Sequence, residues 1–94
     1  MLISDDTRFL IPDHVLSRKA AGETVVLNLD NEEYYSLDDV GARAWELMET
    51  GITFAEAIAT LLDEYEVEGD LLRADLTALV GDLVESGLVL VDAP

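Results

Sequence analysis

Few side chains in this 94-residue sequence are of the types that catalyse reactions or hold metal ions. It contains no cysteine and a single histidine, His14. One imidazole without a thiolate or a second histidine makes neither a zinc site nor a nucleophilic triad. Carboxylates are abundant, but in a chain with 21 acidic residues they fall close together by chance. We therefore expect a binding protein, not an enzyme, with no metal ion and no cofactor.

An acidic segment, residues 63–70, is the one stretch whose spacing suggests calcium. Counted from Glu64, acidic residues fall at the first, third, fifth, seventh and twelfth positions of a calcium-binding loop, with Gly69 at the sixth. Such a loop uses short Asp or Asn ligands early and a bidentate Glu at its end. Here the long and short carboxylates are interchanged, so we interpret the segment as a solvated loop between two helices.

The net charge of −16 disfavours partners that carry phosphate. Only five residues are basic, so nucleic acid and anionic membrane surfaces would be repelled. The acids either solvate the surface or attract a basic partner. The first residues lack the basic and apolar regions of a signal peptide, and no apolar run reaches the roughly 18 to 20 residues that span a bilayer. We expect one soluble, cytoplasmic domain, with residues 1–12 as a candidate flexible segment.

A three-stranded antiparallel sheet is predicted in the first half of the chain. Residues 14–19 can form a strand, and residues 23–29 alternate, with Val25, Leu27 and Leu29 on one face. The acidic and amide residues that follow tolerate the geometry of a turn. The chain then returns as a third strand.

The return strand, residues 33–37, has aromatic side chains and is predicted to lie at an edge of the sheet. We expect Tyr35 and Leu37 on one face, and Glu33, Tyr34 and Ser36 on the other. An exposed edge can accept a peptide as a further strand. Alternatively, Tyr34 is a half-buried aromatic of the strand and the C-terminal tail covers the edge. The pattern leaves both interpretations open.

Three helices are predicted after the sheet. The first covers residues 39–49, and the second opens with a capping box that begins at Thr53. The third follows a cap at Asp70 and stops at Gly87. Residues 88–91 then form a short buried strand or a tail over the core. The order is that of an α+β domain resembling a winged helix-turn-helix, with a three-stranded antiparallel sheet followed by three helices. The third helix has an apolar face made of Leu72, Leu76, Leu79, Val80 and Leu83.

The winged-helix order makes DNA a candidate partner, and the local charge argues against it. A recognition helix should present basic and amide side chains, but the third helix offers only Arg73 among several acids. An acidic winged-helix regulator is therefore the less favoured alternative.

Several segments form an ordered set along the chain. They are Val26-Leu27-Asn28-Leu29, Tyr34-Tyr35-Ser36-Leu37-Asp38-Asp39-Val40-Gly41-Ala42-Arg43-Ala44-Trp45-Glu46-Leu47-Met48, Thr53-Phe54-Ala55-Glu56-Ala57-Ile58, and Asp75-Leu76 with Leu83 and Gly87-Leu88-Val89. Together they resemble the PqqD-like family over about residues 14–91. The segment from Tyr35 to Trp45 is most similar to the stand-alone form from lasso-peptide clusters, the B1 type. PqqD proper usually has Asn where this chain has Asp38.

The resemblance implies a RiPP recognition element, which binds the leader peptide of a ribosomally made and later modified natural product. The leader would add as a strand beside residues 33–37, in a cleft closed by the third helix. The precursor would then pass to a B2-type leader peptidase and to an ATP-dependent cyclase. Service to a radical-SAM or other modifying enzyme is the alternative.

The contact residues that the resemblance implies lie on the strand and on the third helix. The leucines of that helix are expected to serve the core more than the contact, because one apolar stripe must also hold the fold together. The implied residues are Glu33, Tyr34, Tyr35 and Ser36 on the strand, and Arg73, Asp75, Leu76, Leu79, Val80 and Leu83 on the helix.

Overall fold

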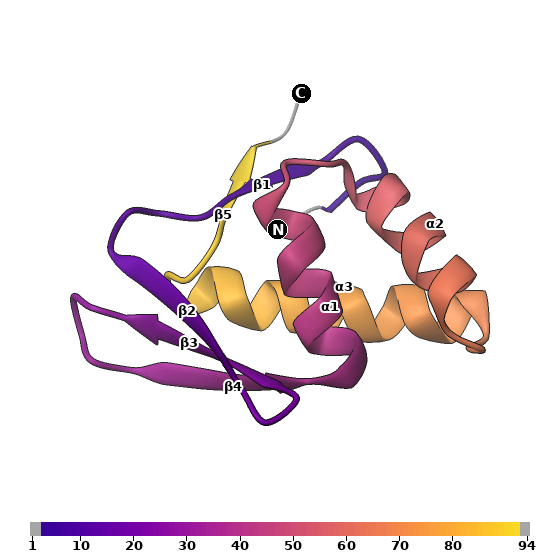
Figure 1. Cartoon of the computed structure of the whole chain (residues 1–94). Helices are drawn as coiled ribbons and strands as arrows, with labels where there is room; N and C mark the ends of the chain where they lie inside the picture. The colour runs from indigo at the N-terminus through magenta and orange to yellow at the C-terminus, as the bar shows by residue number, and fades with distance from the viewer. Residues whose placement is uncertain (1–2, 93–94) are drawn as a thin grey trace.

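The computed structural model describes residues 3–92, without the side chain of Asp38. Figure 1 shows α1 lying between a three-stranded sheet and a smaller two-stranded one, with α3 running behind it. This confirms the predicted α+β order, in which a three-stranded antiparallel sheet precedes three helices. The elements are β1 (Arg8–Leu10), β2 (Val15–Ala20), β3 (Glu23–Asn28), β4 (Tyr34–Asp38), α1 (Asp39–Glu49), α2 (Phe54–Glu64), α3 (Gly69–Glu85) and β5 (Leu90–Asp92).

The three-stranded sheet has the order β2-β3-β4, so β2 and β4 are its two edges. Both pairings are antiparallel, with Leu27 opposite Leu16 on one side and opposite Tyr34 on the other. The strand expected at residues 33–37 begins and ends one residue later, so Glu33 lies just before it.

The face of β3 that packs on the core is not the one with the larger apolar side chains. Thr24, Val26 and Asn28 are buried, whereas Val25 and Leu27 are half-buried on the outer face. The alternation is present, but it does not indicate which face the helices cover.

The smaller sheet pairs β1 with β5, antiparallel, and the sequence pattern did not predict β1. Phe9 lies opposite Val91 in this pairing and is 3% exposed. A strand of three residues is too short to show an alternation that can be recognised. Leu88 and Val89, just before β5, are buried in the core, so the chain after α3 does cover the core as expected.

The helices begin and end near their predicted positions. α1 covers the predicted range, and the capping box of α2 is confirmed: Glu56 N–H donates to Thr53 Oγ1 (3.2 Å), and Thr53 N–H donates to Glu56 Oε1 (2.9 Å). The cap of α3 was predicted wrongly. Glu68, not Asp70, accepts hydrogen bonds from the backbone N–H groups of Asp70 and Leu71, so the helix starts at Gly69.

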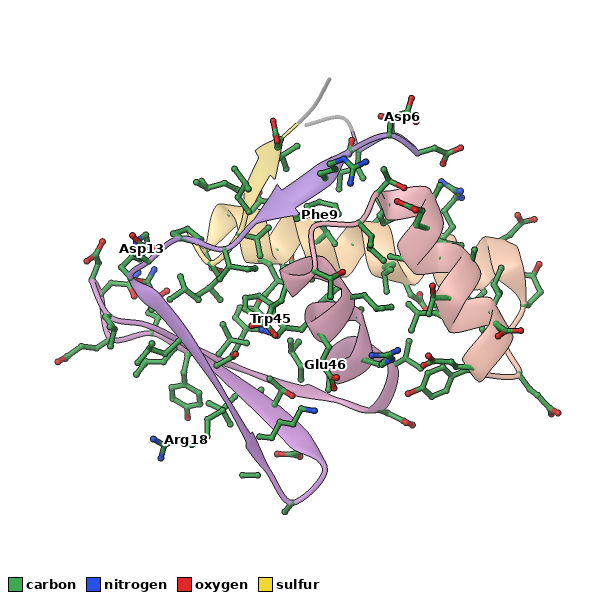
Figure 2. All side chains as sticks on the ribbon, turned by 45° about the horizontal axis from the view of Figure 1, so that its top comes forward. Asp6, Phe9, Asp13, Arg18, Trp45 and Glu46 are labelled. Atoms are coloured by element: carbon green, nitrogen blue, oxygen red, sulfur yellow. The ribbon has the colours of Figure 1, made fainter. Side chains whose placement is uncertain are left out.

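The hydrophobic core is formed between the helices and the inner faces of both sheets. Figure 2 shows Trp45 at its centre, below β1, with Phe9 beside α2. The rings of Phe9 and Phe54 make an edge-to-face contact at 6.3 Å, a favourable geometry for aromatic pairs. The largest fully buried apolar side chains are Trp45, Phe54, Leu61, Leu83, Leu88, Val26, Val80 and Val89.

Candidate functional site

The outer edge of β4 is open. Within residues 3–92, β4 pairs only with β3, and β5 pairs with β1 in the other sheet. The C-terminal strand therefore does not cover this edge, which removes one of the two alternatives left by the sequence.

The hydrogen-bond pattern decides which backbone groups of β4 are free. Asn28 N–H donates to Glu33 C=O (2.8 Å), so these opposite residues form a hydrogen-bonded pair. Such pairs alternate along an antiparallel ladder. Tyr35 and Leu37 therefore bond to β3, whereas the N–H and C=O groups of Tyr34 and Ser36 point away from the sheet. These two residues provide backbone donors and acceptors for an additional strand.

The side chains of β4 separate into an exposed and a buried set. Tyr34 is 71% exposed, so it is not the half-buried strand aromatic of the alternative interpretation. Ser36 is also exposed, and its hydroxyl donates to Glu23 Oε2 at 3.3 Å. Tyr35 is half-buried and packs against the core, where Leu37 is fully buried. Only the outward-facing residues are available to a partner.

α3 runs alongside β4 in the opposite direction (Figure 1). The Cδ2 atom of Leu79 and the Cβ atom of Leu37 lie 3.7 and 3.8 Å from the position of a Cβ at Gly41. At the C-terminal end of α3, Asn28 Nδ2 on β3 donates to Ser86 C=O at 3.3 Å. These contacts hold the middle and the C-terminal end of α3 against the sheet.

One flank of α3 carries polar groups on the side of β4. Asp75 and Asp82 are four and three residues from Leu79, so all three side chains share one side of the helix. Leu79 is half-buried and both aspartates are exposed. Within residues 3–92 neither aspartate forms an ion pair. The flank therefore has an apolar centre between two carboxylates without cations.

The remaining apolar residues of the α3 stripe belong to the core. Leu76 is 4% exposed, Val80 1% and Leu83 0%. Three of the implied contact residues therefore have almost no surface to offer, because the core needs their side chains. Leu79 is the implied apolar residue of α3 that reaches the side of β4.

Arg73 lies on the opposite flank of α3. Its guanidinium forms an ion pair with Asp5 at 2.8 Å and lies 5.5 Å from the centre of the Phe54 ring. Both partners belong to the side of the molecule where the N-terminal segment covers α2. Among the implied residues, Tyr34 and Ser36 are on the outward side of β4, and Asp75 and Leu79 share one flank of α3. Glu33 lies just before β4, and Arg73 lies elsewhere.

Asn28 is a residue whose structural importance sequence reasoning missed. It is 3% exposed, and its Oδ1 accepts from Asp30 N–H at 2.9 Å while its Nδ2 reaches Ser86. It therefore ties the hairpin turn to the end of α3 and positions the open edge. A polar residue that ends an apolar strand was the indication available in the sequence.

A strong ion pair between α1 and α2 lies away from this site. Arg43 donates two hydrogen bonds of 2.8 Å to Glu64. The bonds from Arg43 lower the pKa of Glu64 below its ordinary value and raise that of Arg43. In the acidic loop, Glu68 caps the N-terminus of α3.

Within residues 3–92 there is no group of three or more residues placed to hold a metal ion. No helix in this range is long and apolar enough to cross a membrane.

Comparison with known proteins gives one family and two similar structures. Residues 23–89 match the family described as Coenzyme PQQ synthesis protein D (PqqD). The chain is similar to a structure of TbiB1 in complex with the TbiA(beta) leader peptide, with 32% identity, a TM-score of 0.81, and coverage of 89% of this chain and 98% of that one. It is also similar to lasso peptide synthetase B1 complexed with the leader peptide, with 29% identity, a TM-score of 0.80, and coverage of 88% and 98%. No curated protein sequence matches this chain.

Proposed function

Since this chain belongs to the PqqD family, we propose that it recognises the leader peptide of a lasso-peptide precursor by accepting it as a strand at the edge of β4. The observation that carries the proposal is the open edge itself, where Tyr34 and Ser36 direct their backbone groups outward. Two proteins of the same fold, each matched over 98% of its length, are complexes with leader peptides.

The flank of α3 beside β4 supplies the second wall of the proposed site. Leu79 offers an apolar contact, and Asp75 and Asp82 offer carboxylates without cations of their own. A peptide with Lys or Arg in the segment that passes this wall would be attracted, and an acidic segment would be repelled. Backbone hydrogen bonds set the register of an added strand, and side-chain contacts set its specificity.

We propose an adaptor role without catalysis. The single histidine, His14, lies 3.8 Å from Asp30 at the exposed end of the hairpin, which is not an arrangement that activates a nucleophile. In the proposed role the protein holds the precursor in the cytoplasm and delivers it to a leader peptidase, from which the core peptide passes to a cyclase.

Binding of a synthetic leader peptide tests this proposal directly. The leader encoded with the neighbouring precursor gene is titrated into the protein by calorimetry, and we expect saturable binding at tens of micromolar or tighter. No binding in that range contradicts the proposed function.

A scan of the peptide backbone tests strand addition separately. One N-methyl group is placed at each successive leader position. An added strand bonds to β4 through every second residue, so we expect an affinity loss of roughly tenfold or more at alternate positions, because each methyl removes one hydrogen bond and leaves a β4 carbonyl unpaired. Uniform losses, or losses with a helical period, contradict strand addition while leaving leader recognition intact.

A further inference from the structure

One buried side chain, that of Asn28, is hydrogen-bonded both to the turn before β4 and to the end of α3. Asn28 is the last residue of β3 and is 3% exposed. Its Oδ1 accepts from Asp30 N–H at 2.9 Å, and its Nδ2 donates to Ser86 C=O at 3.3 Å. A backbone N–H can only donate and a C=O can only accept, so these two partners define the orientation of the amide. Figure 1 shows the ends of β3 and α3 on the same side of the molecule.

On the side of the turn, Asn28 determines where β4 begins. Its backbone N–H donates to Glu33 C=O at 2.8 Å, and its C=O accepts from Glu32 N–H at 2.9 Å. Glu32 has a φ of 60°, a conformation that is uncommon for a residue with a side chain. The bond from Asp30 N–H to Oδ1 closes the same turn, because an Asn side chain readily accepts from the backbone two residues later. Tyr34, the first residue of β4, follows directly.

On the side of the helix, Gly87 leaves room for the Asn28 amide. Ser86 is the C-cap of α3, at the helix end where carbonyl groups lack partners within the helix. Gly87 follows with a φ of 74°, a conformation that favours glycine at this position. A Cβ at Gly87 would lie 3.4 Å from Asn28 Nδ2. We call the hydrogen bond from Asn28 Nδ2 to Ser86 C=O the Asn28–Ser86 link.

We propose that Asn28 is a positioning residue for leader recognition, because it sets the distance between the start of β4 and the flank of α3. The proposal rests on the proposed function, in which the leader lies between these two walls. The start of β4 carries Tyr34, and Asp82 lies one helical turn before Ser86. Both walls are tied to the same amide. A binding site holds its contacts only when its walls are placed to within about 0.5 Å.

The packing of α3 on the core does not replace the Asn28–Ser86 link. Leu83 and Leu88, on either side of Ser86, are fully buried, so the helix stays on the core when the amide is changed. Apolar contacts are not directional, whereas a hydrogen bond has a preferred length and angle. Loss of the link should therefore displace the flank of α3 slightly and leave the fold intact.

Two substitutions break the Asn28–Ser86 link from its two ends. Asn28→Asp keeps the acceptor for Asp30 N–H but places an oxygen against Ser86 C=O, and the two oxygens repel each other. Gly87→Ala adds a Cβ against the amide. Gly22→Ala is the matched control, because Gly22 also has a positive φ, of 84°, while no atom of residues 3–92 lies within 4 Å of a Cβ placed there. Calorimetry measures leader affinity, and urea unfolding checks that each variant folds.

We expect Asn28→Asp and Gly87→Ala each to weaken leader binding roughly five- to tenfold, as the loss of about one hydrogen bond's worth of contact would do. Gly22→Ala should also lower the free energy of unfolding, because alanine is strained at a positive φ. Its leader affinity should stay within twofold of the native value. A loss of affinity in Gly22→Ala equal to that in Gly87→Ala would assign the effect to general destabilisation and overturn the proposal.

A double-mutant cycle separates positioning from a general loss of binding. Leu79→Ala removes the apolar contact of the flank and should cost roughly fivefold in leader affinity in the native background. Beside Asn28→Asp it should cost no more than twofold, because the flank has already moved. Tyr34→Ala should cost the same in both backgrounds, because its contact lies on the strand. If Asn28→Asp does not fold, Gly87→Ala takes its place in the cycle.

Two results overturn the positioning role of Asn28. One is leader affinity within twofold of native in the folded variants that lack the Asn28–Ser86 link. The other is an equal cost of Leu79→Ala in both backgrounds, which would show that the flank keeps its place without the link. Failure of the proposed function is seen separately, as native protein that binds no leader.

Discussion

The two edges of the same sheet differ in what surrounds them, although both have unpaired backbone groups. On β2, Leu29 N–H donates to His14 C=O at 2.8 Å, so by alternation Ser17 and Lys19 direct their groups outward. On β4, Tyr34 and Ser36 do so. β2 carries adjacent cations, and Lys19 is tied to Glu46 of α1 at 2.9 Å. Charged side chains on an edge strand oppose pairing with another chain.

The edge of β4 has no cation, and an apolar residue of α3 lies beside it. A strand that adds to β4 gains hydrogen bonds and a contact with Leu79, whereas one that adds to β2 meets Lys19 and its ion pair. If the leader adds as proposed, free backbone groups are necessary for strand addition but do not select the edge. The adjoining helix would then select it.

The largest effect is expected from proline at the outward-facing serines of the two edges. At either serine, proline removes a backbone N–H that does not bond to β3, so both variants should fold. Ser36→Pro should weaken leader binding roughly 10- to 100-fold. The N–H of Ser36 can no longer donate to the leader, which leaves a C=O group of the leader unpaired. The matched variant Ser17→Pro should bind within twofold of native in calorimetry. Equal losses in both variants would show that the leader does not distinguish the edges.

Tyr34→Ala should have the next largest effect. The side chain is 71% exposed, so the free energy of unfolding should change by no more than about 0.5 kcal/mol in urea. Leader affinity should fall roughly tenfold, since a large aromatic contact is removed. Leu16→Ala, in the same row on β2, is the control and should keep its leader affinity. A Tyr34 variant that unfolds would place this side chain in the core.

The two flanks of α3 should differ by a smaller amount. Asp75→Lys should weaken binding of a leader with basic residues a few-fold, as exposed charge pairs contribute up to about 1 kcal/mol. Arg73→Ala should leave leader affinity unchanged and lower the unfolding free energy, because its ion pair with Asp5 and its contact with Phe54 are lost. The Asp75 effect should shrink as salt is added. A larger loss of affinity for Arg73→Ala than for Asp75→Lys would exchange the roles of the flanks.

The smallest effect is expected for the stability of the protein in acid, through the capping box of α2. This cap lies away from both edges of the sheet. Hydrogen bonds from Thr53 lower the pKa of Glu56 from its ordinary value of 4.5. The unfolded chain then binds this proton at a higher pH than the folded one. The stabilisation is therefore present above pH 4.5 and is lost as the pH falls through the lowered pKa. Thermal melts of Glu56→Gln should show a shallower decline in Tm below pH 4.5 than native protein. An identical decline would show that this cap does not contribute to acid sensitivity.

The sequence was sufficient for elements with a clear period and failed where a period is absent or does not identify the covered face. α1 was predicted over about its observed range because its apolar spacing ends shortly before Gly51, where φ is 77°. β1 has three residues and no period. The outer face of β3 was not foreseen because Val25 and Leu27 are apolar without being core.

The candidate site was predicted in part for similar reasons. The β4 edge followed from the strand order, but Arg73 was included for its charge, without regard to its angular position on α3. Its spacing of six residues from Leu79 separates it from the flank beside β4, as its pairing with Asp5 shows. The sequence alone could not separate the leucines of α3 that pack in the core from the one on the flank, because a single apolar stripe supplies both.

The pairing of β1 with β5 has a consequence for how the chain folds. It joins Arg8 to Asp92, and closing so long a loop costs more entropy than forming hairpins between consecutive strands. The sheet that carries the open edge consists only of such hairpins. We therefore expect β1 and β5 to associate late in folding and to separate first under mild denaturant. The open edge of β4 should therefore be complete before β1 and β5 pair.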